Sequence, residues 1–280
     1  MASLAMMTWA MAPATAHAAA QAPRVITLTP HATEMVYAAG GGRFIVGTVS
    51  SSDYPKEAQA IPRIGDGIIF NPERIVVLSP TLFVGWLRSG VALQTEGLAS
   101  ELGAQVVYSR PERVRDIPAD LLRLGDIMGT AAIAGAKAAE LEARIDTLES
   151  KYRNKTPVKL FIEVGTAPLY TIGSDPLLND ALSMCSAVNV YAKSGIPAPR
   201  VTVESVLVQN PQLLVIAGRH AQENGGSRER WASYGLPAAR EGRLHEADPD
   251  ALFRPGPRFI DAIEALCEAV DAARPGSGTE

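Results

Sequence analysis

Residues 130–153, TAAIAGAKAAELEARIDTLESKYR, decide the fold of this 280-residue chain. Apolar side chains recur there at steps of three to five residues, and charged side chains fill most of the other positions, as in an amphipathic helix. The apolar stripe consists of Ile133, Ala138, Leu141, Ile145, Leu148 and Tyr152. Thr130 offers an N-cap oxygen, and Asn154 with Pro157 ends the helix. About 23 residues at ~1.5 Å each form a rod of roughly 35 Å, which can connect two domains.

The sequences on the two sides of this rod contain one repeated pattern. Residues 73–84, ERIVVLSPTLFV, align without gaps on residues 204–215, ESVLVQNPQLLV. Both segments predict a helix, a turn and a buried strand, and a capping residue, Asn71 or Thr202, stands two positions before each Glu. The large offset between the copies indicates two related lobes and not adjacent solenoid repeats. We therefore predict an α/β protein with two Rossmann-like lobes joined by a single long backbone helix.

The predicted boundaries follow from this layout. The N-terminal lobe covers 24–128, the connecting helix 130–153 and the C-terminal lobe 157–270, and 271–280 forms a disordered tail. In the second lobe we expect an irregular segment at 231–237 and a rigid loop at 253–258, whose prolines leave Arg254 and Arg258 free to project.

The N-terminus predicts export. Residues 1–18 carry no charge and end in Ala16-His17-Ala18, a small-x-small cleavage signature, so we assign them to a signal peptide. The positively charged start of such peptides is missing, so either the start codon is assigned late or the signal is weak. In an exported chain the only two cysteines, Cys185 and Cys267, are candidates for a disulfide within the second lobe, and two buried thiols are the alternative.

Composition and motifs favour binding over catalysis. The net charge of −4 and the lack of Lys/Arg runs argue against a nucleic-acid partner. There is no Walker loop, HExxH motif, nucleophile elbow or strand-to-helix GxGxxG. His31, His220 and His245 lack the spacing of a helical metal site, so we predict no metal and no enzyme activity. Two α/β lobes whose strand ends face each other form a cleft, where ligands usually bind.

Several motifs carry a resemblance to a known family. They are Arg24–Leu28 with Thr33-Glu34, the loop 50–55, Asn71-x-Glu73, the segment 78–86, Cys185, the segment 197–204, Asp250 with Arg254, Pro257-Arg258 and Cys267. With them the mature chain resembles, over nearly its whole length, the periplasmic vitamin B12-binding proteins of cobalamin ABC importers, which have the helical-backbone (class III) fold. The resemblance implies a periplasmic monomer that carries cobalamin, or a related corrinoid, to a permease dimer and has no catalytic cofactor.

The same resemblance implies a set of ligand-binding positions. In this family aromatic side chains sandwich the corrin ring between the lobes, and an Asp and an Arg make polar contacts with it. The matching positions that are retained in kind are Trp86, Tyr170, Asp250 and Arg254, and those that have lost an aromatic residue are Ser51, Gly67 and Ala198. The candidates to replace the lost aromatics are Ile68, Ile69, Phe70 and Tyr191.

The three lost aromatics leave other ligands open. They fit weaker cobalamin binding or another large ligand such as a corrinoid precursor, haem or a siderophore. Haem requires an axial ligand, for which His31, Tyr54 and His245 are candidates. A cleft hydrolase using His245 and Asp250 is a remote alternative from another class.

Glu73 and Glu204 match two surface carboxylates with which this family docks onto arginines of the two permease subunits. Equivalent positions in both lobes suit a partner with two-fold symmetry. The alternative role is local, because each Glu also interacts favourably with the dipole of its own helix.

Overall fold

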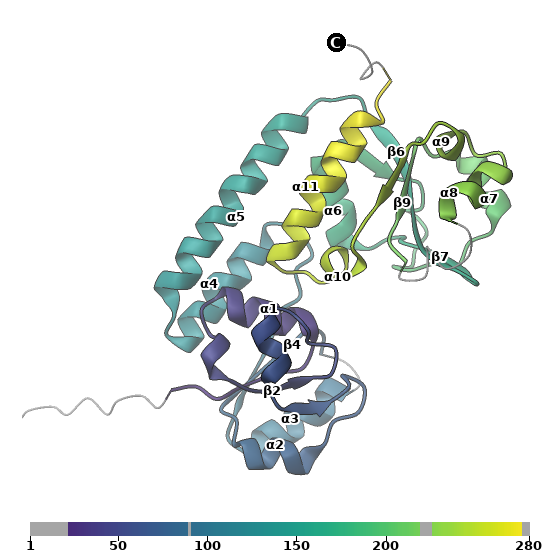
Figure 1. The fold of residues 1–280 in the computed structure, drawn as a ribbon. Coiled ribbons are helices and arrows are strands. Elements are labelled where there is room, and N and C mark those ends of the chain that lie inside the picture. Colours follow the sequence, from purple (N-terminus) through teal and green to yellow (C-terminus); the bar gives the residue numbers. More distant parts are fainter. Residues whose placement is uncertain (1–21, 89–90, 219–225, 276–280) are drawn as a thin grey trace, which may run out of the picture.

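The computed structural model describes residues 22–88, 91–218 and 226–275. These residues form two α/β lobes with separate sheets, and one long helix connects them (Figure 1). The predicted signal peptide, 1–18, and the final part of the predicted tail, 276–280, lie outside the described residues. No helix within the described ranges has both the length and the apolar character needed to span a bilayer.

The N-terminal lobe is built on a parallel sheet. Its elements are β1 (Val25–Thr27), α1 (Pro30–Ala38), the 3-10 helix η1 (Gly42–Phe44), β2 (Ile45–Val49), the 3-10 helix η2 (Lys56–Ala60), β3 (Arg63–Gly65), α2 (Pro72–Leu78), β4 (Leu82–Gly85), α3 (Val91–Glu101), β5 (Gln105–Tyr108) and α4 (Asp116–Met128). The strand order is β3-β2-β1-β4-β5 and every pair is parallel. This Rossmann-like order reverses direction between β1 and β4, so the carboxyl ends of these two strands open a crevice.

The C-terminal lobe repeats this plan with a mixed sheet. Its elements are β6 (Val158–Thr166), β7 (Leu169–Thr171), α6 (Pro176–Met184), β8 (Ala187–Asn189), α7 (Val203–Gln209), β9 (Leu213–Ile216), α8 (Ser227–Ser233), α9 (Pro237–Arg240), β10 (Leu244–Glu246), α10 (Pro249–Leu252) and α11 (Pro257–Ala272). Strands β10, β9 and β6 are parallel neighbours, β8 pairs with β6 in parallel, and β7 pairs with β6 in antiparallel orientation. The two lobes therefore confirm the predicted fold class.

One predicted segment of this lobe is wrong. Residues 231–237, expected to be irregular, contain the end of α8 and the start of α9. Trp231 is 1% exposed and packs edge-to-face on Phe161 of β6, so burial of a single large ring holds the short helix α8 in place. A helix of seven residues is too short to show a clear period in the sequence.

The connecting helix α5 spans Ala131–Tyr152, close to its predicted bounds. It lies beside α4 at one end and beside α11 along its second half (Figure 1). Arg144 of α5 fixes the second contact, because its guanidinium forms ion pairs with Asp261 and Glu264 of α11 at 2.5 and 2.6 Å.

Two details of this helix differ from the sequence-based expectation. The hydroxyl of Thr130 does not cap α5 but donates to the carbonyl of Ala39 at 2.6 Å. Ile133 is 54% exposed, and Ala134 takes its place in the buried stripe. The reason is the close approach of α4, since a Cβ on Gly125 would lie only 2.3 Å from the Cβ of Ala134.

The repeated segment has the same geometry in both lobes. The side chains of Asn71 and Thr202 cap α2 and α7 by accepting from the backbone N–H three residues on, at 2.9 and 3.2 Å. Ser79 and Asn210 end these helices in the left-handed conformation, both with φ 44°. The alignment of residues 73–84 on 204–215 thus corresponds to equivalent helix–turn–strand units.

The largest apolar core is shared between the lobes. It runs from the N-terminal sheet through α4 and α5 to α6 and α11 of the C-terminal lobe. Two smaller clusters cover the opposite faces of the sheets, one around Phe83 and the other around Phe161 and Trp231. The connection between the lobes is therefore a packed helical layer and not one isolated rod.

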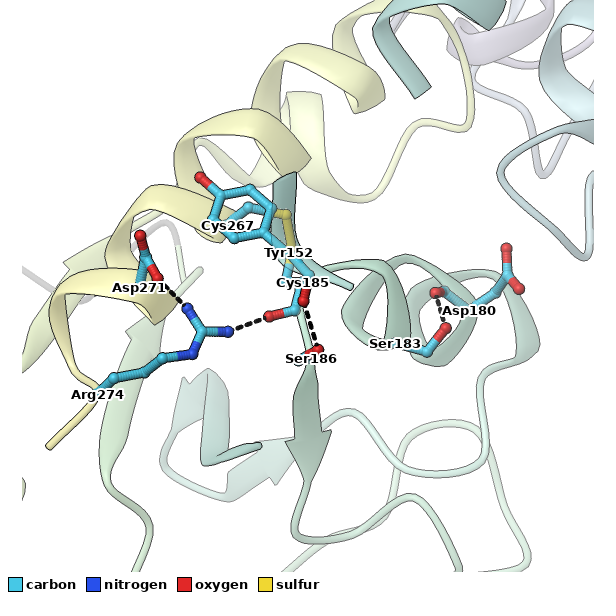
Figure 2. The surroundings of a disulfide bond; sticks show 8 residues. All are labelled: Tyr152, Asp180, Ser183, Cys185, Ser186, Cys267, Asp271 and Arg274. Carbon is cyan, nitrogen blue, oxygen red and sulfur yellow. Dashed lines mark hydrogen bonds and ion pairs between the residues drawn. A yellow bond between two sulfur atoms is a disulfide. The ribbon is translucent and has the colours of Figure 1, made fainter. Parts of the chain in front are cut away.

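Cys185 and Cys267 form the predicted disulfide (Figure 2). Both are fully buried, and the bond ties the end of α6 to the middle of α11. Arg274 extends this junction, because its guanidinium donates to the carbonyl of Cys185 at 2.6 Å and pairs with Asp271. Helix α11 continues to Ala272, so the ordered part of the lobe extends past the predicted boundary at 270.

The contact of Gly125 with Ala134 can be tested by G125A. Alanine favours a helix over glycine by about 1 kcal/mol. Overpacking a tight interface costs about 1–3 kcal/mol, so we expect G125A to lower the free energy of unfolding in urea. G135A is the matched control, since a Cβ on Gly135 of α5 meets nothing within 4 Å and should stabilise the protein. The double variant G125A/A134G should recover part of the loss. Equal stability of G125A and G135A would contradict the close packing.

Candidate functional site

A hollow of about 280 Å³ opens between the two lobes. Its walls are mostly apolar and come from both lobes, and they include Trp86, Leu87, Pro111, Ile172, Pro197 and Phe253. The polar side chains that line it are Arg110, Glu112 and Asp175. Trp86 directly follows β4, so the hollow lies at the carboxyl edge where the N-terminal strand order reverses.

Trp86 is the largest aromatic side chain that lines this hollow. It is 43% exposed and its indole meets the ring of His31 edge-to-face, with centroids 5.7 Å apart. His31 is buried, and its two ring nitrogens bond the hydroxyl of Thr29 at 3.0 Å and the carbonyl of Ser109 at 3.1 Å. Burial lowers the pKa of His31 to about 4, so the ring is neutral at neutral pH. A fixed, uncharged imidazole thus supports one edge of Trp86.

A buried ion cluster joins the lobes next to this hollow. Glu34 of α1 is 3% exposed and accepts two hydrogen bonds from Arg258 of α11, at 2.9 and 2.5 Å. Nη1 of Arg254 lies 3.3 Å from Glu34 Oε1 and donates to Asp53 Oδ1 at 2.5 Å. Nη2 of Arg254 lies 3.0 Å from Asp250 Oδ1. Carboxylates of the first lobe are therefore bound by guanidinium groups of the second.

The cluster corrects the expectation that Arg254 and Arg258 project freely. Their side chains are only 8% and 18% exposed. The hydrogen bond from Arg254 lowers the pKa of Asp53, and the hydrogen bonds to Glu34 raise the pKa of Arg258. Asp53 and Arg258 are therefore charged at neutral pH.

The predicted ligand-binding residues fall into two groups. Trp86 lines the hollow, and Asp250 and Arg254 flank Leu252 and Phe253, which also line it. Tyr170 of β7 is 40% exposed and lines a second hollow of about 240 Å³ at the carboxyl end of β6.

Ser51, Gly67 and Ala198 are not among the residues that line the hollow of Trp86. Ser51 follows β2 and Gly67 follows β3, at the same sheet edge as Trp86. Ala198 is exposed in the segment 197–199, whose carbonyl groups accept hydrogen bonds from the N–H groups of Thr171 at the end of β7 and of Gly173. Ser51 and Gly67 therefore lie at the rim of the N-terminal sheet that also carries Trp86.

The candidate replacements for the lost aromatics differ in exposure. Ile68 and Ile69 are 74% and 72% exposed, because Asp66 accepts from both of their backbone N–H groups and turns the loop outward. Phe70 packs against the core of the N-terminal lobe. Tyr191 packs on Phe161 and its hydroxyl bonds Ser205 at 2.7 Å, so it is already used within its own lobe.

The three candidate haem ligands are poorly placed for that role. His31 has both nitrogens bonded, as described above. The ring of Tyr54 is stacked under the guanidinium of Arg258 at 4.1 Å. His245 of β10 is half-buried, and burial lowers its pKa. His220 lies outside the described residues. Within the ranges that the structure describes, no three His, Cys, Asp or Glu side chains gather as a metal site.

Residues 25–251 match a family model described as periplasmic binding protein. The chain belongs to this family. A vitamin B12-binding protein of Photorhabdus laumondii is 35% identical over 248 residues, which cover 89% of this chain and 88% of that relative. The solved periplasmic vitamin B12 binding protein BtuF of Vibrio cholerae has a TM-score of 0.81 at 29% identity, covering 90% of this chain and 97% of the other.

The chain is also similar to a solved haem-binding protein, and this similarity is evidence for the fold alone. The periplasmic heme-binding protein RhuT from Roseiflexus sp. RS-1, in apo form, has a TM-score of 0.76 at 24% identity and covers 90% of this chain and 100% of its own. This periplasmic binding protein thus belongs to a family whose members bind substrates and do not transform them, in agreement with the absence of a catalytic motif.

Sequence reasoning missed the partners of Arg254 in this periplasmic binding protein. Glu34 and Asp53 belong to motifs that were used only to support the family resemblance, and neither was given a role of its own. A signal was present, because Glu34 is the one acidic residue of helix α1, PHATEMVYA, whose apolar residues predict burial. A buried carboxylate needs a cationic partner, but the sequence does not say where that partner lies.

The low pKa of His31 predicts how stability depends on pH. Since its pKa falls from 6.5 when unfolded to about 4 when folded, the unfolded chain binds the proton first as the pH drops. The contribution of neutral His31 to the free energy of unfolding is therefore complete above pH 6.5. As the pH falls to about 4, this contribution decreases by roughly 3 kcal/mol. H31Q should flatten this part of the profile in urea unfolding, whereas H245Q should keep most of it. An unchanged slope in H31Q would refute the assignment to His31.

Proposed function

We propose that this chain captures cobalamin, or a related corrinoid, between its lobes and delivers it to an ABC importer. The observation that carries this proposal is the apolar hollow between the lobes with Trp86 on its wall. The 35% identity to a relative named vitamin B12-binding protein supports the choice of ligand. Haem is the weaker candidate, because His31 and Tyr54 already have partners.

The chemistry of the hollow suits a macrocycle. An aromatic face and aliphatic walls attract the flat, apolar faces of a corrin ring. Arg110 and Glu112 on these walls, and Arg254 next to the lining residue Phe253, provide donors and acceptors for the amide side chains at the edge of the ring. The proposed ligand-binding set is Ser51, Gly67, Trp86, Tyr170, Ala198, Asp250 and Arg254.

The three positions without an aromatic residue lower the expected affinity. Each lost ring contact removes about 0.5–1.5 kcal/mol beyond its buried area. The exposed side chains of Ile68 and Ile69 follow Gly67 directly and offer apolar area at the same rim. They contribute area without a π-face, so binding should be weaker than in a site with the full aromatic set.

Glu73 and Glu204 are the proposed docking residues for the permease. Both are exposed in the first turn of their helices, and neither forms an ion pair with a described residue. Four residues on, Val77 and Val208 are 80% and 82% exposed. Residues four apart share one helix face, so each lobe presents a carboxylate beside an apolar side chain. This arrangement fits two equivalent permease subunits that each offer a cation.

The local role of these carboxylates coexists with docking. A hydrogen bond from its own backbone N–H, and a second from the hydroxyl of Thr202, lower the pKa of Glu204. Both interactions leave the exposed edge of the carboxylate available to a partner. We also propose that residues 1–18 direct export to the periplasm and that the mature chain acts as a monomer.

Titration calorimetry of the mature chain with cyanocobalamin, dicyanocobinamide and haemin tests the ligand. We expect saturable heats with the corrinoids and no shift of the haem Soret band. W86A should weaken corrinoid binding about tenfold or more, because it removes the ring that faces the ligand. Y234A is the matched control, since Tyr234 is 44% exposed but packs on Trp231 away from the hollow. Axial ligation of haemin without corrinoid binding would overturn the proposal.

Charge reversal tests docking. E73K/E204K should abolish cobalamin uptake in cells that depend on this chain, because each lobe would present a cation to a cationic site. Cobalamin affinity of the purified variant should equal that of the wild type. E241K, at an exposed position in the turn after α9, is the control and should leave uptake intact. Uptake that survives the double reversal would sink the docking assignment.

A further inference from the structure

Arg254 is enclosed by carboxylates before any ligand arrives. Asp53, Asp250 and Glu34 lie 2.5, 3.0 and 3.3 Å from its terminal nitrogens, and its side chain is 8% exposed. A guanidinium covered in this way can bind a ligand at full strength only if one of these carboxylates gives way. The three partners differ in how readily they can do so.

We propose that Asp53 is an exchangeable cover on Arg254 that sets the affinity for the ligand. On ligand entry the Asp53 carboxylate turns into solvent, and an acceptor oxygen of the ligand takes its hydrogen bond. This inference rests on the proposed function, because it requires a ligand with carbonyl or phosphate oxygens at its edge.

Exposure singles out Asp53 as the partner that leaves. Its side chain is 52% exposed, whereas that of Glu34 is 2% exposed. A half-exposed pair contributes little, and a released Asp53 regains its hydration. A released Glu34 would leave a charge buried within the cluster, which is strongly unfavourable.

The remaining two carboxylates are also tied down by their neighbours. Glu34 is held by both hydrogen bonds from Arg258 and therefore stays in place during the exchange. Asp250 lies four residues before Arg254 on the same lobe, so it moves with the guanidinium and keeps it oriented. Asp53 comes from the loop after β2 of the other lobe, and its backbone is bound there through the carbonyl that accepts from Gln59 at 3.1 Å. Only its side chain has to move.

The exchange leaves the lobes fixed. Asp53 and Glu34 both bridge to the C-terminal lobe, but the bonds between Glu34 and Arg258 persist when Asp53 departs. Ligand binding at Arg254 therefore needs no hinge motion. The Asp53 carboxylate and an acceptor oxygen of the ligand compete for the guanidinium of Arg254.

The competition predicts that removing the cover improves binding. In calorimetry with cyanocobalamin, D53N and D53A should bind about two- to fivefold more tightly than the wild type, the range for a half-exposed ion pair. D146N is the matched control, since Asp146 of α5 is also an exposed ion-pair partner of an arginine, Arg115, and this variant should bind with the affinity of the wild type. An affinity of D53A equal to or weaker than that of the wild type would overturn the exchange.

A second measurement needs no ligand. Phenylglyoxal labels accessible guanidinium groups, and peptide mapping gives the labelling rate at Arg254. We expect faster labelling of Arg254 in D53A than in the wild type, and an unchanged rate at Arg115 as the internal reference. An equal rate at Arg254 in both proteins would show that Asp53 is no cover, even if calorimetry finds no corrinoid binding. Absence of all corrinoid binding with faster labelling would refute the proposed ligand and with it the exchange, while leaving the cover itself intact.

Discussion

The buried carboxylate of Glu34 is the constraint on which the rest of this structure depends. A charge at 3% exposure is tolerated only with partners, and both of its guanidinium partners, Arg254 and Arg258, come from the other lobe. Separating the lobes at this point would take both guanidinium partners away from the buried Glu34 carboxylate. A second bridge, from the N–H of Val114 to the carboxylate of Asp180 at 2.8 Å, also holds the two lobes together.

These bridges restrict the motion between the lobes that a single connecting helix would allow. A lone helix would let the lobes bend about its ends, but here α5 is part of an apolar core that continues from α4 to α11. The lobes are held on one side by this core and near the hollow by the ion cluster. Binding energy is then not spent on closing the cleft, and the affinity depends on how well the preformed walls fit the ligand. A missing aromatic ring cannot be compensated by closure of such a cleft.

The sequence could predict features that repeat or that have a period. The long helix follows from its apolar stripe, and the two lobes follow from the alignment of residues 73–84 on 204–215, which keeps caps and turns in register. Contacts between distant elements have no such signal. The exchange of Ile133 for Ala134 depends on the approach of Gly125 from another helix, and the burial of Arg254 depends on Glu34, 220 residues away. Loop prolines predicted a rigid backbone but not the direction of its side chains.

The repeated unit itself argues for a partner that contacts both lobes. Among its identical positions, the Pro, the Leu and the second Val are buried in both copies, and folding alone explains them. Val77 and Val208 have no such reason to match, because both are at least 80% exposed and valine is a poor helix former. Helix stability would favour Ala, Lys or Glu at such a site. An exposed β-branched residue beside a first-turn carboxylate, at equivalent places in both lobes, supports the proposed docking of each lobe onto an equivalent permease subunit.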